Sequence, residues 1–363
     1  MPLLIRLLGI ALLGALAIAA LVGAFVSWSP SGWVALGGCA VAALAFATRE
    51  RRVRRGLALA SGALLAILLV VRLVGGAEGM IRMVTLPHGS SSRWLGRLID
   101  EQDVGLAGAR VLAWQWRLPP DERRQLLPAM HDAYVDMRRD DVFTPSPVLD
   151  TLLARQGPDA FDTLVIEPRA ESIPAPKYGV IFLHGFAGSY TLECWLVAKA
   201  ARTVGALTVC PATDFSGLWR GEAGESILRA TLDYLRGRGI KRVFLAGLSN
   251  GAAGASVLAP RFASFLTGLI LISGAPAQGG NAGLPTLVVH GTDDTVASAV
   301  SARAFATRTH STYTSFEGGH FVLLVRRAEI RDAIASWLMG QLGLHETGSA
   351  IRKIPVDLPG IAP

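Results

Sequence analysis

Two long apolar runs mark the N-terminal part of the chain. No charged residue occurs from Leu7 to Thr48, and a second uncharged run covers Gly56–Val71. As one helix, rising ~1.5 Å per residue, the first run would be about twice as long as the ~30 Å hydrocarbon core of a bilayer. It therefore has to turn, and Pro30 and Gly32 lie near its middle. We predict a membrane region over residues 1–76 with three spans, near 6–27, 32–48 and 57–76.

A basic cluster separates the second predicted span from the third. Five arginines lie between Arg49 and Arg55, and Glu50 is the single acid of residues 1–75. Arginine-rich loops favour the cytoplasmic side, so with three spans the chain after residue 76 is expected outside the cytoplasm, in a multi-pass protein of the cell membrane. Two alternatives stay open. One is a two-span arrangement, which leaves the catalytic part in the cytoplasm. The other is a cleaved signal peptide, whose apolar region is usually only ~7–15 residues long.

Composition narrows the class of protein further. The chain is 51% hydrophobic and 17% charged, which excludes a disordered chain and argues against a purely soluble one. Most of the formal net charge of +7 belongs to residues 1–75, so no basic surface for nucleic acid is expected on the folded part. The three cysteines exclude a disulfide-dense mini-protein, and no Cys/His spacing fits a zinc site.

A small helical region is predicted beside the membrane, over residues 77–160. A helix start at 119–122, with acids in the first turn, is followed by apolar residues at helical spacing, and a short helix is expected after Pro147. Glu101–Asp103 form a polar cluster, for which a solvated or capping role is preferred to a role in a site. The last segment, 344–363, is expected to be a tail.

From residue 161 onward, short apolar runs alternate with helical stretches near 192–203, 222–238 and 250–259. The expected buried strands are Leu164–Ile166, Val180–Leu183, Leu207–Val209, Val243–Ala246, Leu269–Ile272 and Thr286–Val289. Such alternation predicts an α/β domain over 161–343, with a mostly parallel sheet of about six to eight strands flanked by helices. Catalytic groups of open sheets of this type lie at the carboxyl ends of the strands.

A serine in a tight turn follows one of these strands. The sequence Gly247-Leu248-Ser249-Asn250-Gly251 leads directly into a helix of small residues. Serine at so sharp a turn is held in a strained backbone conformation, and Gly247 and Gly251 avoid clashes on either side. The turn lifts the hydroxyl clear of the sheet, and the helix N-terminus favours developing negative charge. Ser249 is therefore the candidate nucleophile.

Another motif, His-Gly-Phe-Ala-Gly at residues 184–188, follows a second predicted strand. With the serine turn, it resembles the α/β-hydrolase superfamily, whose oxyanion loop follows such a His-Gly pair. The resemblance implies that the backbone N–H groups of Phe186 and Asn250 hold the oxyanion of the reaction. We expect His184, together with Gly185, to support this loop rather than to catalyse.

The acid is expected C-terminal to Ser249. No Asp or Glu occurs from Asn250 to Thr292. The loop after the strand at 286–289 resembles the acid-bearing turn of the superfamily, in which the carboxylate comes three residues after a glycine. That resemblance favours Asp294 over Asp293.

His320 is the candidate base. A flexible Gly-Gly pair at 318–319 lets its loop reach over the strand ends toward Ser249. His310 is the rival, but it lies where a helix gives way to a strand, and His290 is expected to be a packing residue. The chain order Ser, Asp, His matches the superfamily and differs from that of chymotrypsin-like and subtilisin-like chains.

These residues together predict a membrane-anchored serine hydrolase of carboxylic esters, lipid-derived esters included, that needs no metal or organic cofactor. A peptidase, a thioesterase, an acyltransferase and a non-catalytic binding domain are alternatives on the same fold. Many members of the superfamily insert a helical lid where this chain has only Gly274–Pro285, so residues 77–160 are the candidate cover. The expected partners are the ester substrate and the lipid bilayer, with no nucleic acid, and the oligomeric state stays open.

Two cysteines are expected at the same edge of the sheet. Cys194 lies near the start of the helix after the 184–188 loop, and Cys210 ends the next strand. In a βαβ unit the helix begins at the edge where the next strand ends, which allows the ~4.4–6.8 Å Cα separation of a disulfide. An extracytoplasmic compartment would permit oxidation. Two unpaired buried cysteines are the alternative, and Cys39 is expected to be a lone thiol in the second span.

Overall fold

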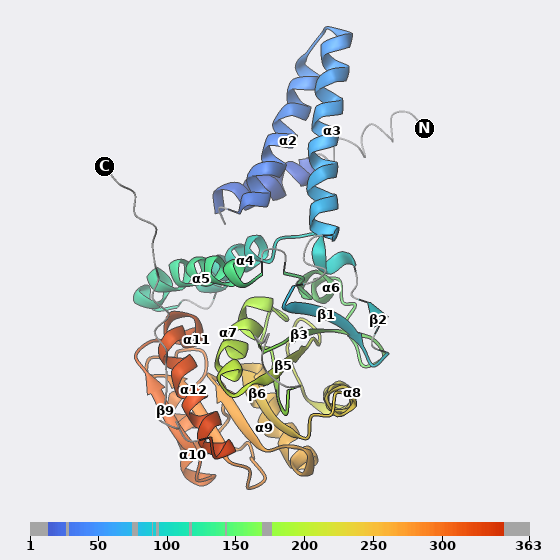
Figure 1. The fold of residues 1–363 in the computed structure, drawn as a ribbon. Coiled ribbons are helices and arrows are strands. Elements are labelled where there is room, and N and C mark those ends of the chain that lie inside the picture. The colour runs from blue at the N-terminus through green and yellow to red at the C-terminus, as the bar shows by residue number, and fades with distance from the viewer. Residues whose placement is uncertain are drawn as a thin grey trace, which may run out of the picture.

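The computed structural model describes residues 14–26, 29–74, 79–88, 90–91, 94–115, 118–141, 144–168 and 176–344. A hairpin of two apolar helices stands on one side of an α/β body, and two further helices lie between hairpin and body (Figure 1). Parts of the predicted spans (residues 6–13, 27 and 75–76) and all but the first residue of the predicted tail lie outside the described residues.

Among the described residues, two helices are long and apolar enough to cross a membrane, by length and composition: α2 (Pro30–Ala47) and α3 (Arg51–Val74). They pack against each other, and the arginine cluster lies at the end of the hairpin away from the body (Figure 1). The first predicted span is represented by a shorter apolar helix, Gly14–Phe25, which runs into the π-helical turn η1 (Val22–Val26). This turn packs against α2 and against α4 (Glu101–Gln115).

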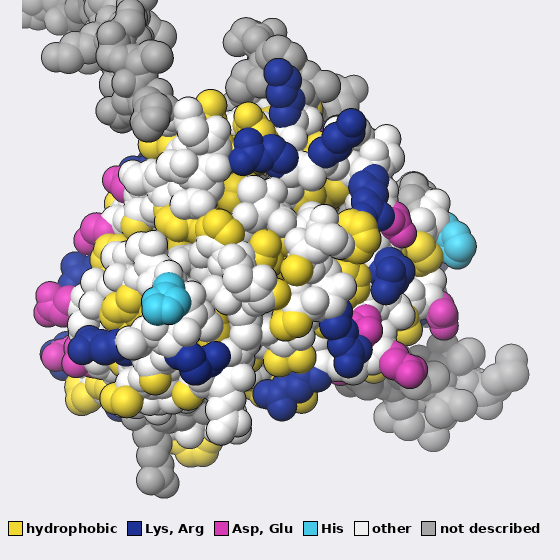
Figure 2. Space-filling model, turned by 90° about the horizontal axis from the view of Figure 1, so that it is seen from below, with side chains coloured by type: hydrophobic (Ala, Val, Ile, Leu, Met, Phe, Trp, Pro, Cys, Tyr) yellow, Lys and Arg dark blue, Asp and Glu magenta, His cyan; other side chains and the backbone are white. Residues whose placement is uncertain are grey.

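The hairpin and the body differ in the surfaces they expose. Leu59, Ile67 and Val74 of α3 are 74%, 61% and 68% exposed. On the face of the body farthest from the hairpin, Lys and Arg side chains are instead interspersed with Asp, Glu and hydrophobic ones (Figure 2). The helix α3 therefore exposes a large apolar surface, unlike this face of the body.

Helices form most of the region between hairpin and body. It contains α4, α5 (Pro120–Asp140) and the short α6 (Val148–Leu152), besides the 3-10 turn η2 (Trp94–Arg97). The sequence predicted α5 and α6 but not α4. The reason is that the buried face of α4 contains small residues such as Gly105, Ala109 and Ala113, which form no apolar stripe.

One sheet forms the centre of the body, in the strand order β2-β1-β3-β5-β4-β6-β7-β8-β9. Strands β4 to β9 run parallel, while β1, β2 and β3 pair antiparallel. The strands are β1 (Ile81–Leu86), β2 (Ser90–Ser91), β3 (Phe161–Ile166), β4 (Tyr178–Leu183), β5 (Ala206–Pro211), β6 (Arg242–Leu248), β7 (Gly268–Ile272), β8 (Thr286–Gly291) and β9 (Thr312–Phe316). All six predicted strands are present, and the predicted α/β-hydrolase fold is confirmed.

Three strands, β1, β2 and β9, were not predicted. β1 lies in the segment expected to be helical and pairs with β3 from Ile81–Ile166 to Leu86–Phe161. The sheet therefore begins before residue 161, the expected start of the α/β domain. β9 is an edge strand of partly exposed polar residues, so it lacks the apolar run by which the inner strands were found.

Helices cover both faces of the sheet. On one face α7 and α12 pack with α4 and α5, and on the other α8, α9 and α10 form a second apolar cluster. The helices of the body are α7 (Thr191–Ala201), α8 (Gly221–Gly237), α9 (Asn250–Phe262), α10 (Ala299–Arg308), α11 (Val322–Val325) and α12 (Arg327–Leu342), with 3-10 turns η3 (Arg202–Val204) and η4 (Ala263–Phe265).

The predicted disulfide is confirmed. Cys194 in α7 and Cys210 in β5 are bonded, with their Cα atoms 6.1 Å apart. Both side chains are buried, whereas Cys39 in α2 is a free, partly exposed cysteine.

Thiol alkylation of the denatured full chain checks this pairing. Without reductant we expect one modified cysteine, Cys39, because the bonded sulfurs cannot react. Reduction before alkylation is the control and should give three modified cysteines. Three modified cysteines without reductant would show that the bond does not form in the protein.

Candidate active site

Ser249 lies in the turn between β6 and α9, in a backbone conformation that its surroundings impose. Its φ of 55° is rare for a residue with a side chain, and such strain costs on the order of 1–3 kcal/mol. A Cβ at Gly247 would lie 2.3 Å from the carbonyl oxygen of Gly251, and one at Gly251 would lie 2.0 Å from that of Leu183. The backbone N–H of Ser249 donates to the carbonyl of Ile272, at 2.9 Å. Neighbouring backbone thus holds the turn, and both glycines are required by close approach.

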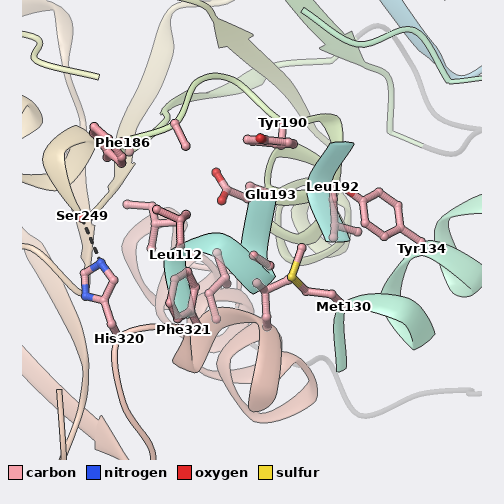
Figure 3. Close-up of a pocket in the computed structure, with 17 residues that line it drawn as sticks. Leu112, Met130, Tyr134, Phe186, Tyr190, Leu192, Glu193, Ser249, His320 and Phe321 are labelled. Carbon is pink, nitrogen blue, oxygen red and sulfur yellow. Dashed lines mark hydrogen bonds between the residues drawn. The ribbon is translucent and has the colours of Figure 1, made fainter. Parts of the chain in front are cut away.

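A chain of hydrogen bonds connects Ser249 to a buried carboxylate. His320 Nε2 lies 3.0 Å from Ser249 Oγ (Figure 3), and His320 Nδ1 lies 2.9 Å from Asp294 Oδ2. The side chain of Asp294 is inaccessible to solvent, and its Oδ1 accepts the backbone N–H groups of Val296 and Ala297 at 2.9 and 2.8 Å. Because a carboxylate only accepts, Nδ1 carries the proton and Nε2 accepts from the serine hydroxyl. The structure therefore brings the predicted serine, acid and base together.

The rival candidates lie elsewhere. Asp293 is exposed and accepts the hydroxyl of Thr292 at 3.0 Å. His310 lies just before β9 begins, at the amino edge of the parallel strands, whereas Ser249 lies at the carboxyl edge. Among the residues that the structure describes, no group of three or more His, Cys, Asp or Glu side chains is placed to hold a metal ion.

His290 is buried against the acid turn. Its Nε2 lies 3.1 Å from the carbonyl oxygen of Ala297 and 3.3 Å from Asp294 Oδ2. Burial lowers the pKa of His290. The neutral ring therefore donates from Nε2 and supports the carboxylate of Asp294, which goes beyond the packing role expected from the sequence.

His184 supports the 184–188 loop from inside the body. Its Nε2 accepts the backbone N–H of Thr213 at 3.0 Å, and its Nδ1–H donates to the carbonyl of Gly185 at 2.8 Å. Burial lowers the pKa of His184 to about 4. A neutral imidazole with both nitrogens engaged has a structural role.

The 184–188 loop lies directly against Ser249. A Cβ at Gly185 would be 3.1 Å from the Cβ of Ser249, and the Ala187 N–H donates to the carbonyl of Phe215 at 2.9 Å. Phe186 lines the same cavity as Ser249. Asn250 is the first residue of α9, where backbone N–H groups have no acceptor within the helix. The backbone N–H groups of Phe186 and Asn250, which the resemblance implies as oxyanion donors, therefore belong to elements on either side of Ser249.

An apolar cavity of about 70 Å³ adjoins the serine (Figure 3). Its walls come from three parts of the chain, namely α4 and α5, the 184–188 loop with α7, and the His320 loop with α11. Gly105, Leu112, Met130 and Tyr134 are contributed by the region between hairpin and body. The segment predicted as a candidate cover therefore forms one wall of the site.

Glu101 connects this wall to the body. It is 3% exposed, and its carboxylate accepts the backbone N–H groups of Thr191 at 2.6 Å and Leu192 at 2.9 Å, at the start of α7. The hydroxyls of Ser146 and Tyr134 donate to the same carboxylate. The sequence predicts that Glu101 is either solvated or a helix cap. The structure shows the capping role, and the capped helix is α7, which begins 90 residues later along the chain.

Glu122 connects α5 to the loop of His320. Its Oε1 accepts the backbone N–H of Phe321 at 2.9 Å, and a Cβ at Gly319 would lie 2.1 Å from its Oε2. Burial raises the pKa of Glu122. This contact was not predicted, but the sequence contains a signal for it, because Glu122 lies four positions before Leu126 on the buried face of α5.

Glu193 lies at the cavity itself, in the first turn of α7. Figure 3 shows its carboxyl group between Tyr190 and Leu112, two other residues that line the cavity. Burial, and secondarily the nearby Glu101, raise the pKa of Glu193 to about 8. The carboxyl group is therefore mostly protonated near neutral pH, as suits an apolar wall.

Comparisons with known proteins were made for the whole chain. No family model and no curated relative matches the sequence. Solved structures similar to this chain include the protein Est1E from Butyrivibrio proteoclasticus, at 16% identity and a TM-score of 0.44 over 51% of this chain and 95% of that one. A lidless α/β serine hydrolase from Xanthomonas campestris is 20% identical, with a TM-score of 0.41 over 50% and 89% of the two chains. The fluorophosphonate-binding serine hydrolase FphF from Staphylococcus aureus is 14% identical, with a TM-score of 0.40 over 50% and 93%.

The raised pKa of Glu193 predicts a pH-dependent stability. Between pH 5 and 8 the unfolded chain loses the proton of this carboxyl group while the folded protein keeps it, so the free energy of unfolding falls as the pH rises. We expect the thermal midpoint in detergent micelles to fall by several degrees over this range. Glu193→Gln should make the decline smaller, because the amide stays neutral at every pH. The exposed Glu222→Gln is the matched control, and an equal slope in both variants would contradict the assignment.

Proposed function

We propose that the protein is a membrane-anchored serine hydrolase that cleaves carboxylic esters. The observation that carries the proposal is the chain of hydrogen bonds from Ser249 through His320 to Asp294. The serine end of this chain lies at an apolar cavity. A serine so placed has a base within reach of its proton, and the base has an orienting carboxylate. The apolar walls favour a substrate with a hydrocarbon acyl group over a peptide.

In the proposed reaction, His320 Nε2 takes the hydroxyl proton of Ser249 as the serine oxygen attacks the ester carbonyl carbon. The tetrahedral oxyanion accepts hydrogen bonds from the backbone N–H groups of Phe186 and Asn250. The imidazolium then gives its proton to the departing alcohol, while Asp294 stabilises the charge on the ring. Water, deprotonated by His320, attacks the acyl-enzyme and releases the acid. No metal or organic cofactor enters these steps.

The proposed location is the outer side of the cell membrane, with α2 and α3 in the bilayer. Two observations support it. The arginine cluster lies at the end of the hairpin away from the body, which is the arrangement that the positive-inside rule favours when the body is outside. The disulfide between Cys194 and Cys210 is typical of an oxidising compartment. The alkylation experiment therefore also bears on this proposal.

Replacement of the serine or of the base tests the reaction. Ser249→Ala and His320→Ala should each lower kcat for p-nitrophenyl butyrate by roughly 10,000-fold or more, because the remaining groups lack an activated nucleophile. Labelling by a fluorophosphonate should disappear in both. Unchanged circular dichroism and thermal midpoint are the controls for folding. A Ser249→Ala variant that still labels and turns over would place the nucleophile elsewhere.

A second pair of variants distinguishes the two neighbouring acids. Asp294→Asn should lower kcat by roughly 1,000-fold or more, since the amide no longer holds the imidazole in the required tautomer. Asp293→Asn is the matched control and should stay within a few-fold of the wild type, because its side chain contacts Thr292 and not the histidine. Equal losses in the two variants would argue against an orienting carboxylate at Asp294.

A further inference from the structure

A second, larger apolar groove lies between the N-terminal helices and the body. It has a volume of about 840 Å³, against about 70 Å³ for the cavity beside the serine. Small-molecule sites usually have ~300–1,000 Å³, so the groove has the size of a binding site. Leu16 and Gly32 line it from the first helices, Leu68 from α3, and Ala107 and Val111 from α4.

The groove and the cavity share part of their walls. Leu112 of α4, with Phe186, Ala187 and Tyr190 of the body, lines both. Figure 3 shows Leu112, Phe186 and Tyr190 around the cavity that ends at Ser249. Phe186 is also the residue whose backbone N–H is proposed to bind the oxyanion. The apolar groove therefore adjoins the cavity of the proposed reaction centre across these four side chains.

The residues that line the groove favour a hydrocarbon chain as its occupant. The residues from the N-terminal helices and α3 are mostly apolar. Three charged residues also line the groove: Arg72 and Asp100 are paired with each other at 3.6 Å, and Asp103 is the third. A cavity of about 70 Å³ leaves room beside the serine for only the reacting end of a long substrate. The remainder of a hydrocarbon chain would then lie in the groove, against the helices that are proposed to stand in the bilayer.

We propose that this groove binds the acyl chain of a lipid ester, which enters from the bilayer between the N-terminal helices and α4 and presents its carbonyl to Ser249. The proposal rests on the proposed function and deepens it, because it makes long-chain lipid esters the preferred substrates. Each CH₂ group buried in the groove should strengthen binding roughly fourfold. Preference should therefore rise with acyl length.

Charge placed in the groove tests the proposal. Val111 is 59% exposed, so Val111→Asp leaves the core intact, and its carboxylate disfavours a hydrocarbon chain. With the full chain in mixed micelles, we expect the ratio of kcat/KM for p-nitrophenyl palmitate to that for p-nitrophenyl butyrate to fall at least 10-fold. Val300→Asp, at a 79% exposed position on α10, is the matched control and should keep the ratio of the wild type. An unchanged ratio in Val111→Asp overturns the proposal.

A second pair of variants tests the proposal by filling the groove with a bulky side chain instead of a charge. Ala107→Trp fills the groove from α4, and Ala223→Trp makes the same change at an exposed position of α8. The first should lower the palmitate-to-butyrate ratio at least 10-fold and the second should not change it. Equal ratios in the two variants overturn the proposal.

A binding measurement separates this proposal from the proposed function. A photoreactive palmitate ester carrying a diazirine near its methyl end is added in phosphatidylcholine vesicles to the Ser249→Ala variant, which does not turn it over. Cross-links on α4 at residues 104–111 support the acyl groove, and cross-links only elsewhere overturn it. Failure of the wild type to hydrolyse either ester or to react with a fluorophosphonate would instead overturn the serine hydrolase, whatever the cross-links show.

Discussion

The arrangement of the site depends on one buried carboxylate, that of Glu101. Tyr190, the N-cap residue of α7, forms no capping hydrogen bond with its side chain, and Glu101 of α4 supplies the missing acceptor. Burial raises the pKa of Glu101, and the hydrogen bonds from Thr191, Leu192 and Ser146 oppose that rise. A carboxylate at a helix N-terminus in a partly buried setting contributes up to about 2 kcal/mol. The contact therefore fixes α4 against the helix that directly follows the proposed oxyanion loop.

Hydrogen bonds to two buried glutamates hold the helical region against the body, on two sides of the cavity. Glu101 fixes α4 beside the 184–188 loop, and Glu122 fixes α5 beside the loop that carries His320. Small residues allow both approaches, since a Cβ at Gly105 would lie 2.4 Å from the hydroxyl of Tyr134, and Gly319 leaves room for the carboxylate of Glu122. The cavity exists because these elements are held at a fixed separation. Its shape is set by polar contacts even though its walls are apolar.

The sequence predicted those parts of the molecule that depend on local chemistry. The inner strands, the turn at Ser249 and the meeting of Cys194 with Cys210 follow from apolar runs, from glycines at close approaches and from the order of elements along the chain. β9 was missed because an edge strand needs no apolar run. The roles of Glu101 and Glu122 depend on partners 90 and 199 residues away, which no local pattern shows. Local spacing thus indicated the groups that are proposed to react but not the elements that enclose them.

The proposed attachment through two helices would have a consequence for kinetics. A body held by a single spanning helix can rotate about that helix, whereas α2 and α3 in a bilayer, with η1 packed on α4, would restrict the orientation of the body. The mouth of the groove would then stay at a constant height above the hydrocarbon core. A substrate dissolved in the same membrane would meet it by diffusion in two dimensions, without first crossing water. The concentration that governs turnover would then be the number of ester molecules per unit area of membrane, and dilution of the surrounding water would leave it unchanged.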